Sequence, residues 1–329
     1  MVNDKTALIK TVTTDSIQFE VPARAGSGKV SVSFNNISYD GPLLAYDYKV
    51  IVTTIAGTGV VGTDNGEGMS ASFYCPWGIA ADTDGNLFIA DCYNRLIRKI
   101  AAGTNQVSSY SIPVTIGGSS FFSPYNIAID NSTHNYYLTD FNEHVLKTDL
   151  NGNFDVIYNG LMPNAGIAVG PDNYLYVGNN TTGNILKMGL NGENPVAYVS
   201  GILTPRNIIF DKDGNMYVAS VSICKVNNDG TYSIAARDNG FMGWEIAVDK
   251  EGNFYEADHF NNVIRRIDVN GVATTIAGNG TAADIDGIGT EASFNGPQGL
   301  TIDEDGNLYV TTFNYENNTG NKVRKITFE

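Results

Sequence analysis

Short runs of apolar and aromatic residues alternate with glycine-containing turns along most of the chain. A phrase of the form Pro-x-Gly-Ile-Ala-x-Asp recurs at intervals of about 40 residues, as PWGIAAD (76–82), PYNIAID (124–130), NAGIAVG (164–170), PRNIIFD (205–211), GWEIAVD (243–249) and PQGLTID (297–303). A turn and an aromatic-rich run follow each phrase, and then a third run and usually a fourth. Asp-Gly or Asn-Gly dipeptides separate many of these runs, which is typical of β-hairpins. No helical periodicity is sustained, so the pattern predicts an all-β fold.

The number of runs predicts how the repeats assemble. Four antiparallel strands in each repeat of about 40 residues describe the blade of a β-propeller. Six first, six second and six third runs are present, but only five fourth runs follow them. The missing run precedes the first repeat, where IVTTIAG (51–57) closely copies VATTIAG (272–278). We therefore predict a six-bladed β-propeller in which the N-terminal strand closes the last blade and removes an exposed sheet edge.

The first 49 residues do not share the repeat. Their segment SIQFEVPARAGSGKVSVSF (16–34) alternates apolar and polar positions and has a glycine-rich turn at Gly26–Gly28. This pattern is typical of antiparallel strands in a small β-sandwich. We therefore divide the chain into a module of residues 1–49 and a propeller of residues 50–329.

Both parts resemble known families. PWGIAADTDGNLFIADCYNRLIRKI (76–100) and PQGLTIDEDGNLYVTT (297–312) resemble NHL repeats, and the likeness covers residues 50–329 in order, turn chemistry and spacing. Blades three and four depart most, because Asn164 replaces the leading proline of one, and the other lacks the loop between its second and third strands. The N-terminal segment looks like the latter part of an IPT/TIG immunoglobulin-like (Ig-like) domain. Its early strands are missing, so either the sequence begins inside that domain or a reduced version of it exists.

Charge narrows the choice of partners. The chain has 20 Lys and Arg residues against 35 Asp and Glu residues, a net charge of −15, and the whole excess lies after residue 50. NHL propellers that bind RNA resemble this one but use a basic face, so we expect no nucleic-acid partner. No apolar run is long enough to span a membrane. A charged-then-apolar leader is lacking, so we expect a signal peptide to be absent or removed.

Few residues are arranged for catalysis or metal binding. Cys75, Cys92 and Cys224 form neither a CxxC pair nor a cluster with zinc spacing, and the redox state of Cys75 and Cys92, which flank one predicted hairpin, stays open. The Asp-x-Asp-Gly-Asn segments, such as 82–86, run directly into strands, which favours hairpin turns over calcium loops. The three histidines occupy unmatched places in their repeats. We therefore expect no catalytic residue, no metal site and no cofactor.

One basic residue stands in the third run of every repeat. These residues are Arg98, Lys147, Lys187, Lys225, Arg265 and Arg324. Because they are spaced one to a blade, we interpret them as structural residues that form ion pairs between blades or keep their charged ends in solvent.

The position after the leading proline carries the main candidate for a ligand site. Both tryptophans of the chain fall at this position, at the start of the strands that line a propeller's axis. Two interpretations stay open: the side chains form a lining for a sugar or peptide, or they plug the mouth of the channel. In the six repeats the position holds Trp77, Tyr125, Ala165, Arg206, Trp244 and Gln298. Neighbouring loops add the rim residues Asp91, Tyr93, Phe141, His144, Asp258, His259, Phe313 and Tyr315. The predicted ligand-binding set is Trp77, Tyr125, Arg206, Trp244, Gln298, Asp91 and Asp258.

The resemblance also implies a cellular location and a function. IPT/TIG-like and NHL segments together resemble secreted or surface-anchored proteins of Gram-negative bacteria, some of them associated with glycan capture. We predict a monomeric, non-catalytic binding or scaffolding protein of the cell surface, periplasm or extracellular space, which binds a glycan or a protein through the propeller's loop face. The alternative is a metal-dependent propeller enzyme of the lactonase or streptogramin lyase type, which would need several His, Asp or Glu side chains converging near the axis.

Overall fold

The chain divides into two compact units, Met1–Ile51 with Thr327–Glu329, and Val52–Ile326. A computed structural model describes residues 6–20, 28–44, 49–116, 118–120, 123–161, 165–236 and 244–329. The secondary structure of these residues is almost entirely β. Its helical elements are three single turns of 3-10 helix, η1 (Gly68–Ser70), η2 (Cys92–Asn94) and η3 (Gly289–Glu291). The prediction of an all-β fold is confirmed.

The first unit contains two antiparallel hairpins among its described residues. β1 (Leu8–Val12) pairs with β2 (Ile17–Glu20). β3 (Gly28–Phe34) pairs with β4 (Ile37–Leu44). Strands therefore stand where the alternating pattern predicts them. The expected turn at Gly26–Gly28 lies outside the described residues except for Gly28, which begins β3.

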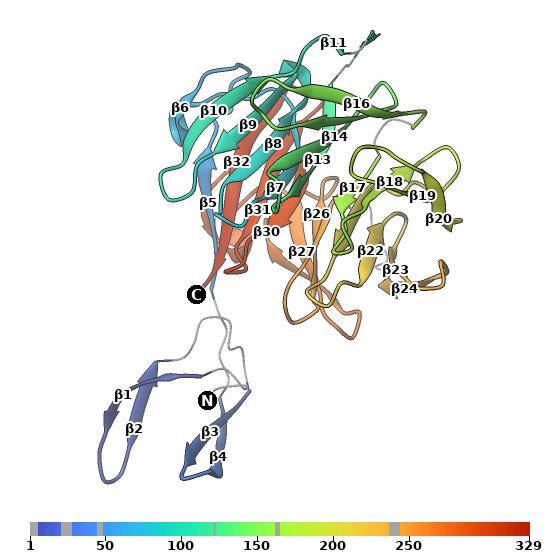
Figure 1. Cartoon of the computed structure of the whole chain (residues 1–329). Coiled ribbons are helices and arrows are strands. Elements are labelled where there is room, and N and C mark those ends of the chain that lie inside the picture. Colours follow the sequence, from blue (N-terminus) through green and yellow to red (C-terminus); the bar gives the residue numbers. More distant parts are fainter. Residues whose placement is uncertain are drawn as a thin grey trace. The chain divides into compact units, whose positions relative to one another are not determined.

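The second unit is a propeller whose blades are antiparallel sheets, and four of these blades have four strands in sequence order (Figure 1). Blade two has β13 (Pro124–Asp130), β14 (Asn135–Asp140), β15 (His144–Thr148) and β16 (Phe154–Asn159). Blade three has β17 (Ile167–Val169), β18 (Leu175–Asn179), β19 (Asn184–Met188) and β20 (Val196–Ser200). Blade four has β21 (Asn207–Phe210), β22 (Met216–Ala219), β23 (Ile223–Val226) and β24 (Tyr232–Ala236). Blade five has β25 (Ile246–Val248), β26 (Phe254–Asp258), β27 (Val263–Ile267) and β28 (Ala273–Ala277).

The other two blades each carry a short fifth strand. Blade one has the order β6-β10-β9-β8-β7, with β6 (Gly66–Glu67), β7 (Pro76–Ala81), β8 (Leu87–Asp91), β9 (Leu96–Ile100) and β10 (Gln106–Ser111). Blade six has the order β29-β5-β32-β31-β30, with β29 (Gly287–Ile288), β5 (Val50–Ala56), β32 (Thr319–Phe328), β31 (Leu308–Asn314) and β30 (Pro297–Ile302). A separate pair, β11 (Thr115–Ile116) and β12 (Ser119–Ser120), follows blade one in the sequence. The described residues thus form the six blades that the repeats predict, and β5 lies next to β32.

Apolar side chains fill the spaces between neighbouring blades. One cluster joins Ile55 of β5 and Tyr309 and Val323 of blade six to Ile79 and Ile89 of blade one. Similar clusters join blade one to two, two to three, three to four, and four to five. Successive side chains of a strand point to opposite faces of its blade, so each strand contributes apolar side chains to the interfaces with both neighbouring blades.

The Asp-Gly-Asn segments form the hairpins that join first to second strands. Asp82 accepts hydrogen bonds from the backbone N–H of Asn86 at 2.7 Å and from its side-chain amide at 2.8 Å, and Gly85 adopts a φ of 80°. Asp303 and Asn307 repeat the same contacts at 2.7 and 2.8 Å. These carboxylates act within their own turns, so the prediction of hairpin turns is confirmed.

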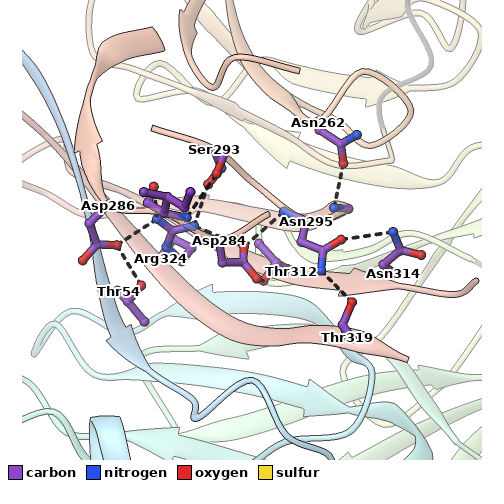
Figure 2. Close-up of polar contacts among 12 residues, drawn as sticks. Thr54, Asn262, Asp284, Asp286, Ser293, Asn295, Thr312, Asn314, Thr319 and Arg324 are labelled. Carbon is purple, nitrogen blue, oxygen red and sulfur yellow. Dashed lines mark hydrogen bonds and ion pairs between the residues drawn. The ribbon is translucent and has the colours of Figure 1, made fainter. Parts of the chain in front are cut away.

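Two buried arginines hold the long loops that lead into blades six and one. Arg324 donates to Asp284 at 3.1 Å, to Asp286 at 2.8 Å and to the carbonyl of Ser293 at 2.9 Å, and Thr54 of β5 donates to Asp286 at 2.8 Å (Figure 2). The equivalent Arg98 donates to the carbonyls of Ser72 and Asp64 at 2.6 and 2.7 Å and to Asp91 at 2.8 Å. Arg98 and Arg324 have a structural role, but the predicted ion pairs between blades and solvated charged ends are wrong for these two residues, because both guanidinium groups are buried against the leading loops of their own blades.

Candidate functional site

The first strand of each blade runs between two faces of the propeller. The Asp-Gly-Asn hairpins lie where the first strands end, and we call this side the turn face. The loops between second and third strands, and the segments that lead into each first strand, lie at the other side, which we call the loop face. The predicted ligand position is the start of the first strands, so it lies at the loop face near the axis.

Aromatic side chains meet over the axis at the loop face. The ring of Trp77 in blade one lies 5.4 Å from that of Trp244, which precedes β25 of blade five, and 4.6 Å from that of Tyr125 in blade two. Phe141 contacts Trp77 and Tyr125 at 6.2 and 5.4 Å. The structure thus brings both tryptophans and the tyrosine of the predicted set together.

These side chains differ in how far solvent reaches them. Trp77, Tyr125 and Gln298 expose only 4%, 1% and 0% of their surface, whereas Trp244 and Arg206 are half-buried. The Arg206 guanidinium lies 4.6 Å from the centre of the Trp244 ring, within the range of a cation–π contact. Rings from different blades meet at this face, so Trp77 and Tyr125 close the channel there. Trp244 and Arg206 are the members of the predicted set that a ligand can reach.

Further aromatic residues surround this closure and are exposed. Tyr93 in η2, Phe260 after β26 and Tyr315 after β31 expose 47%, 58% and 38% of their surface. Tyr315 lies 5.6 Å from Trp77 and 5.8 Å from His259, whose ring contacts that of Phe260 at 5.1 Å. We call Tyr93, Trp244, Phe260 and Tyr315 the aromatic patch. Tyr93, Trp244 and Tyr315 are among the residues predicted from the sequence. Phe260 is not, although it aligns with Tyr93, two places after the aspartate that ends the second strand.

Polar side chains fix the loops that carry the patch. Asn295 donates to Thr319 at 2.7 Å and accepts from Asn314 at 3.0 Å, at the two ends of the loop that bears Tyr315 (Figure 2). Asn262, in the loop that bears Phe260, accepts from the N–H of Gly296 at 2.9 Å. The rings are therefore presented by loops that are hydrogen-bonded to the leading loop of blade six, which reduces the ordering cost of binding.

The two acidic members of the predicted set lie inside their blades. Asp91 is fully buried and pairs with Arg98 at 2.8 Å, and Asp258 is fully buried and pairs with Arg265 at 2.9 Å. Burial raises the pKa of Asp91 to about 6 even though Asn94 and Arg98 hydrogen-bond to the charged form. Neither carboxylate is exposed at the loop face, so a ligand bound there would not contact them.

The comparisons with known proteins agree with this architecture. Residues 49–245 match the family model of the Teneurin NHL domain, which is more than half of the chain. The chain belongs to the Teneurin NHL domain family. The NHL resemblance inferred from the repeats is therefore confirmed, and the match covers the first four blades of the NHL propeller. No curated protein matches the sequence.

Solved structures share the propeller fold at low sequence identity. A protein of unknown function from Bacteroides thetaiotaomicron has 20% identity and a TM-score of 0.73, and the alignment covers 98% of this chain and 87% of that chain. An auxiliary nutrient binding protein from the same species has 19% identity and a TM-score of 0.68, with 95% and 86% covered. Virginiamycin B lyase from Staphylococcus aureus has 14% identity and a TM-score of 0.55, with 85% and 99% covered. At these identities the likeness shows the fold alone.

Two further findings bear on the kind of site that this NHL propeller offers. Among the residues that the structure describes, no three His, Cys, Asp or Glu side chains gather as a metal site would require. Within the same residues, no helix is long and apolar enough to cross a membrane.

A buried carboxyl beneath the aromatic closure makes the stability of the propeller depend on pH. Glu245 is 2% exposed, and burial raises its pKa from the usual 4.5 to about 8, although the N–H of Leu300 donates to it at 3.0 Å. A carboxyl with a raised pKa stabilises the fold only while it is protonated. Its contribution is complete below pH 4.5 and declines as the pH rises through 8.

We therefore expect the melting temperature to fall between pH 5 and pH 8 more steeply in the wild type than in Glu245→Gln. The expected difference is about 1.4 kcal/mol of unfolding free energy for each pH unit in that range. Thermal melts of both proteins across the range measure it, with Glu304→Gln, at an exposed position, as the matched control. Parallel pH profiles for wild type and Glu245→Gln would contradict the expectation.

Proposed function

We propose that this protein is a non-catalytic binding protein that captures a glycan through the aromatic patch. The observation that supports this most directly is the aromatic patch itself, in which Tyr93, Phe260 and Tyr315 are exposed and the half-buried Trp244 contacts the Arg206 guanidinium. Aromatic faces pack against the C–H faces of sugars, and tyrosine O–H and guanidinium N–H groups supply hydrogen bonds at the rim. The net charge of −15 disfavours nucleic acids and other polyanions, so the ligand is neutral.

One protein with the same fold is named as a nutrient binding protein, which also supports a binding role. The auxiliary nutrient binding protein of Bacteroides thetaiotaomicron shares this propeller over most of both chains. On that basis we propose a location at the cell surface, in the periplasm or outside the cell of a Gram-negative bacterium. We further propose that the hairpins β1–β2 and β3–β4 belong to a partial Ig-like module of the IPT/TIG type, and that β5 closes the ring of blades.

The proposal is tested by screening the wild type on a glycan array beside Tyr315→Ala and Phe260→Ala. Each substitution removes an exposed ring of the patch, so we expect binding to fall at least tenfold, the equivalent of about 1.4 kcal/mol. Tyr174→Ala is the matched control, because Tyr174 is 44% exposed in the hairpin between β17 and β18 at the turn face.

The outcomes separate the glycan from a protein ligand. Equal binding by wild type and both patch variants would remove the patch as the site. An array on which the wild type binds nothing would leave the glycan proposal without a ligand and would favour the alternative that the loop face binds a protein. The metal-dependent enzyme stays the alternative function, because virginiamycin B lyase shares the fold. It would need at least three metal-ligating side chains at one point, and no such group is found among the described residues.

A further inference from the structure

A cavity runs along the axis of the propeller below the aromatic closure. Its volume is about 310 Å³, near the lower end of the range for small-molecule pockets, and residues from the first strands of all six blades line it. One layer of its wall consists entirely of aliphatic residues, Ile79, Ile127, Ile167, Ile208, Ile246 and Leu300.

The cavity is closed at one end and open at the other. Trp77 and Tyr125 are buried at the loop face, where their rings contact each other. The lining residues at the other ends of the first strands, among them Val169, Val248 and Thr301, are half-buried. Exposure thus increases along each strand, so the cavity is a blind pocket that opens at the turn face, on the opposite side from the aromatic patch.

The closed end of this pocket is polar. Asn126 and Asn207 line it, two places after the leading proline, and the equivalent position holds glycine in three blades and Glu245 in blade five. A Cβ atom on Gly78 would lie 2.7 Å from Oδ1 of Asn126, so the glycine of blade one makes room for the amide of blade two.

The carboxyl of Glu245 reaches the axial side of the neighbouring blade. Its Oε2 accepts from the N–H of Leu300 at 3.0 Å. In antiparallel strands, residue pairs that hydrogen-bond to each other alternate with pairs that do not. Because Asp303 N–H donates to Asn307 at the turn, the pair of Leu300 in β30 and Val310 in β31 is one that does not. The N–H of Leu300 therefore points away from β31 and toward the axis, which places the Glu245 carboxyl beside Leu300, a residue of the pocket wall.

Oε1 of Glu245 and Nδ2 of Asn126 are among the buried polar atoms that have no hydrogen-bond partner within the described part of the chain. Their side chains are 2% and 3% exposed. Buried polar groups in native proteins are nearly always hydrogen-bonded, so a missing partner points to a bound molecule. That molecule has to satisfy an amide donor and a carboxyl oxygen at the same time.

We propose that the axial pocket binds a small neutral molecule whose hydroxyl group hydrogen-bonds to Glu245 and Asn126 and whose compact apolar body fills the aliphatic channel. A hydroxyl both donates and accepts, so it can pair with the Asn126 amide and with Glu245, whereas an ammonium cannot accept from Asn126. Burial raises the pKa of Glu245 to about 8 because it disfavours the charged carboxylate, and the same desolvation disfavours a charged ligand at this place. This site is independent of the aromatic patch.

Three probes that share a cyclohexane ring and differ in charge test the proposal. Saturation-transfer NMR and calorimetry at pH 7 would compare cyclohexanol, cyclohexylammonium and cyclohexanecarboxylate, with cyclohexanecarboxamide as a second neutral group that donates and accepts. We expect cyclohexanol to bind, the carboxamide to bind comparably or more weakly, and both ions to bind at least tenfold more weakly than cyclohexanol.

Two substitutions locate the binding. Thr301→Phe adds a ring at the half-buried open end of the pocket and should weaken cyclohexanol binding at least tenfold, whereas Thr275→Phe, on the exposed side of β28, should leave it unchanged. Circular dichroism establishes that each variant folds, and if Thr301→Phe does not fold, Glu245→Leu replaces it with the same expected loss. Binding of no probe, tighter binding of an ion, or cyclohexanol binding that survives the blocking variant would overturn the proposal.

Discussion

Deleting residues 50–57 should lower the melting temperature of the propeller by about 10 °C or more. The deletion removes β5, whose Val52, Ile55 and Ala56 are buried and of which Ile55 and Ala56 belong to the cluster between blades six and one. Burial of a Val or Ile side chain is worth about 1.5–3 kcal/mol. Each kcal/mol shifts the melting temperature of a domain of this size by about 2–4 °C. The loss also exposes the edge of β32, so we expect aggregation on heating.

The matched control is a chain that begins at residue 50, which lacks the N-terminal hairpins but keeps β5. Calorimetry or circular dichroism of the deletion variant, this control and the full chain measures the effect. The control should unfold within a few degrees of the full chain. If the deletion variant melts together with the control, β5 does not stabilise the ring, and the proposed closure is wrong.

Replacing Arg324 by methionine should destabilise the protein by about 3–5 kcal/mol, the usual cost of removing one partner of a buried ion pair. Arg324 is fully buried and satisfies Asp284, Asp286 and the carbonyls of Ile285 and Ser293 (Figure 2). Without the guanidinium, the Asp284 carboxyl, whose side chain is 5% exposed, loses its charged partner. Denaturant unfolding at pH 7 measures the change.

Lys225→Met is the matched control, because Lys225 occupies the same position of the third strand in blade four. Lys225 is half-buried, and its ammonium lies 5.6 Å from the centre of the Tyr217 ring rather than in an ion pair described by the structure. We expect a change of about 1 kcal/mol or less, the usual range for a single contact near the surface. If Arg324→Met and Lys225→Met lose similar amounts of unfolding free energy, the buried hydrogen bonds of Arg324 do not stabilise the protein more than the surface contact of Lys225 does.

Turn chemistry and strand periodicity, which are local properties, are readable from the sequence. The hairpin at Asp82–Asn86 depends on a carboxylate that accepts from residues up to four places ahead and on a glycine with positive φ. Repetition of such hairpins predicts the blades, and the surplus run at residues 51–57 predicts the place that β5 occupies in the sheet of blade six. The sequence by itself therefore determined the architecture and the common place of Trp77 and Trp244.

The accessibility of the site was decided only by the tertiary structure. Trp77, Tyr125 and Gln298 occupy the predicted positions but are buried, because side chains from different blades meet near the axis, and no sequence pattern records that distance. The exposed rings are instead on loops, and they include Phe260, which aligns with Tyr93 of blade one. The polar end of the axial pocket likewise arises from residues of different blades, Glu245 and Asn126, which closure of the ring brings to one axis.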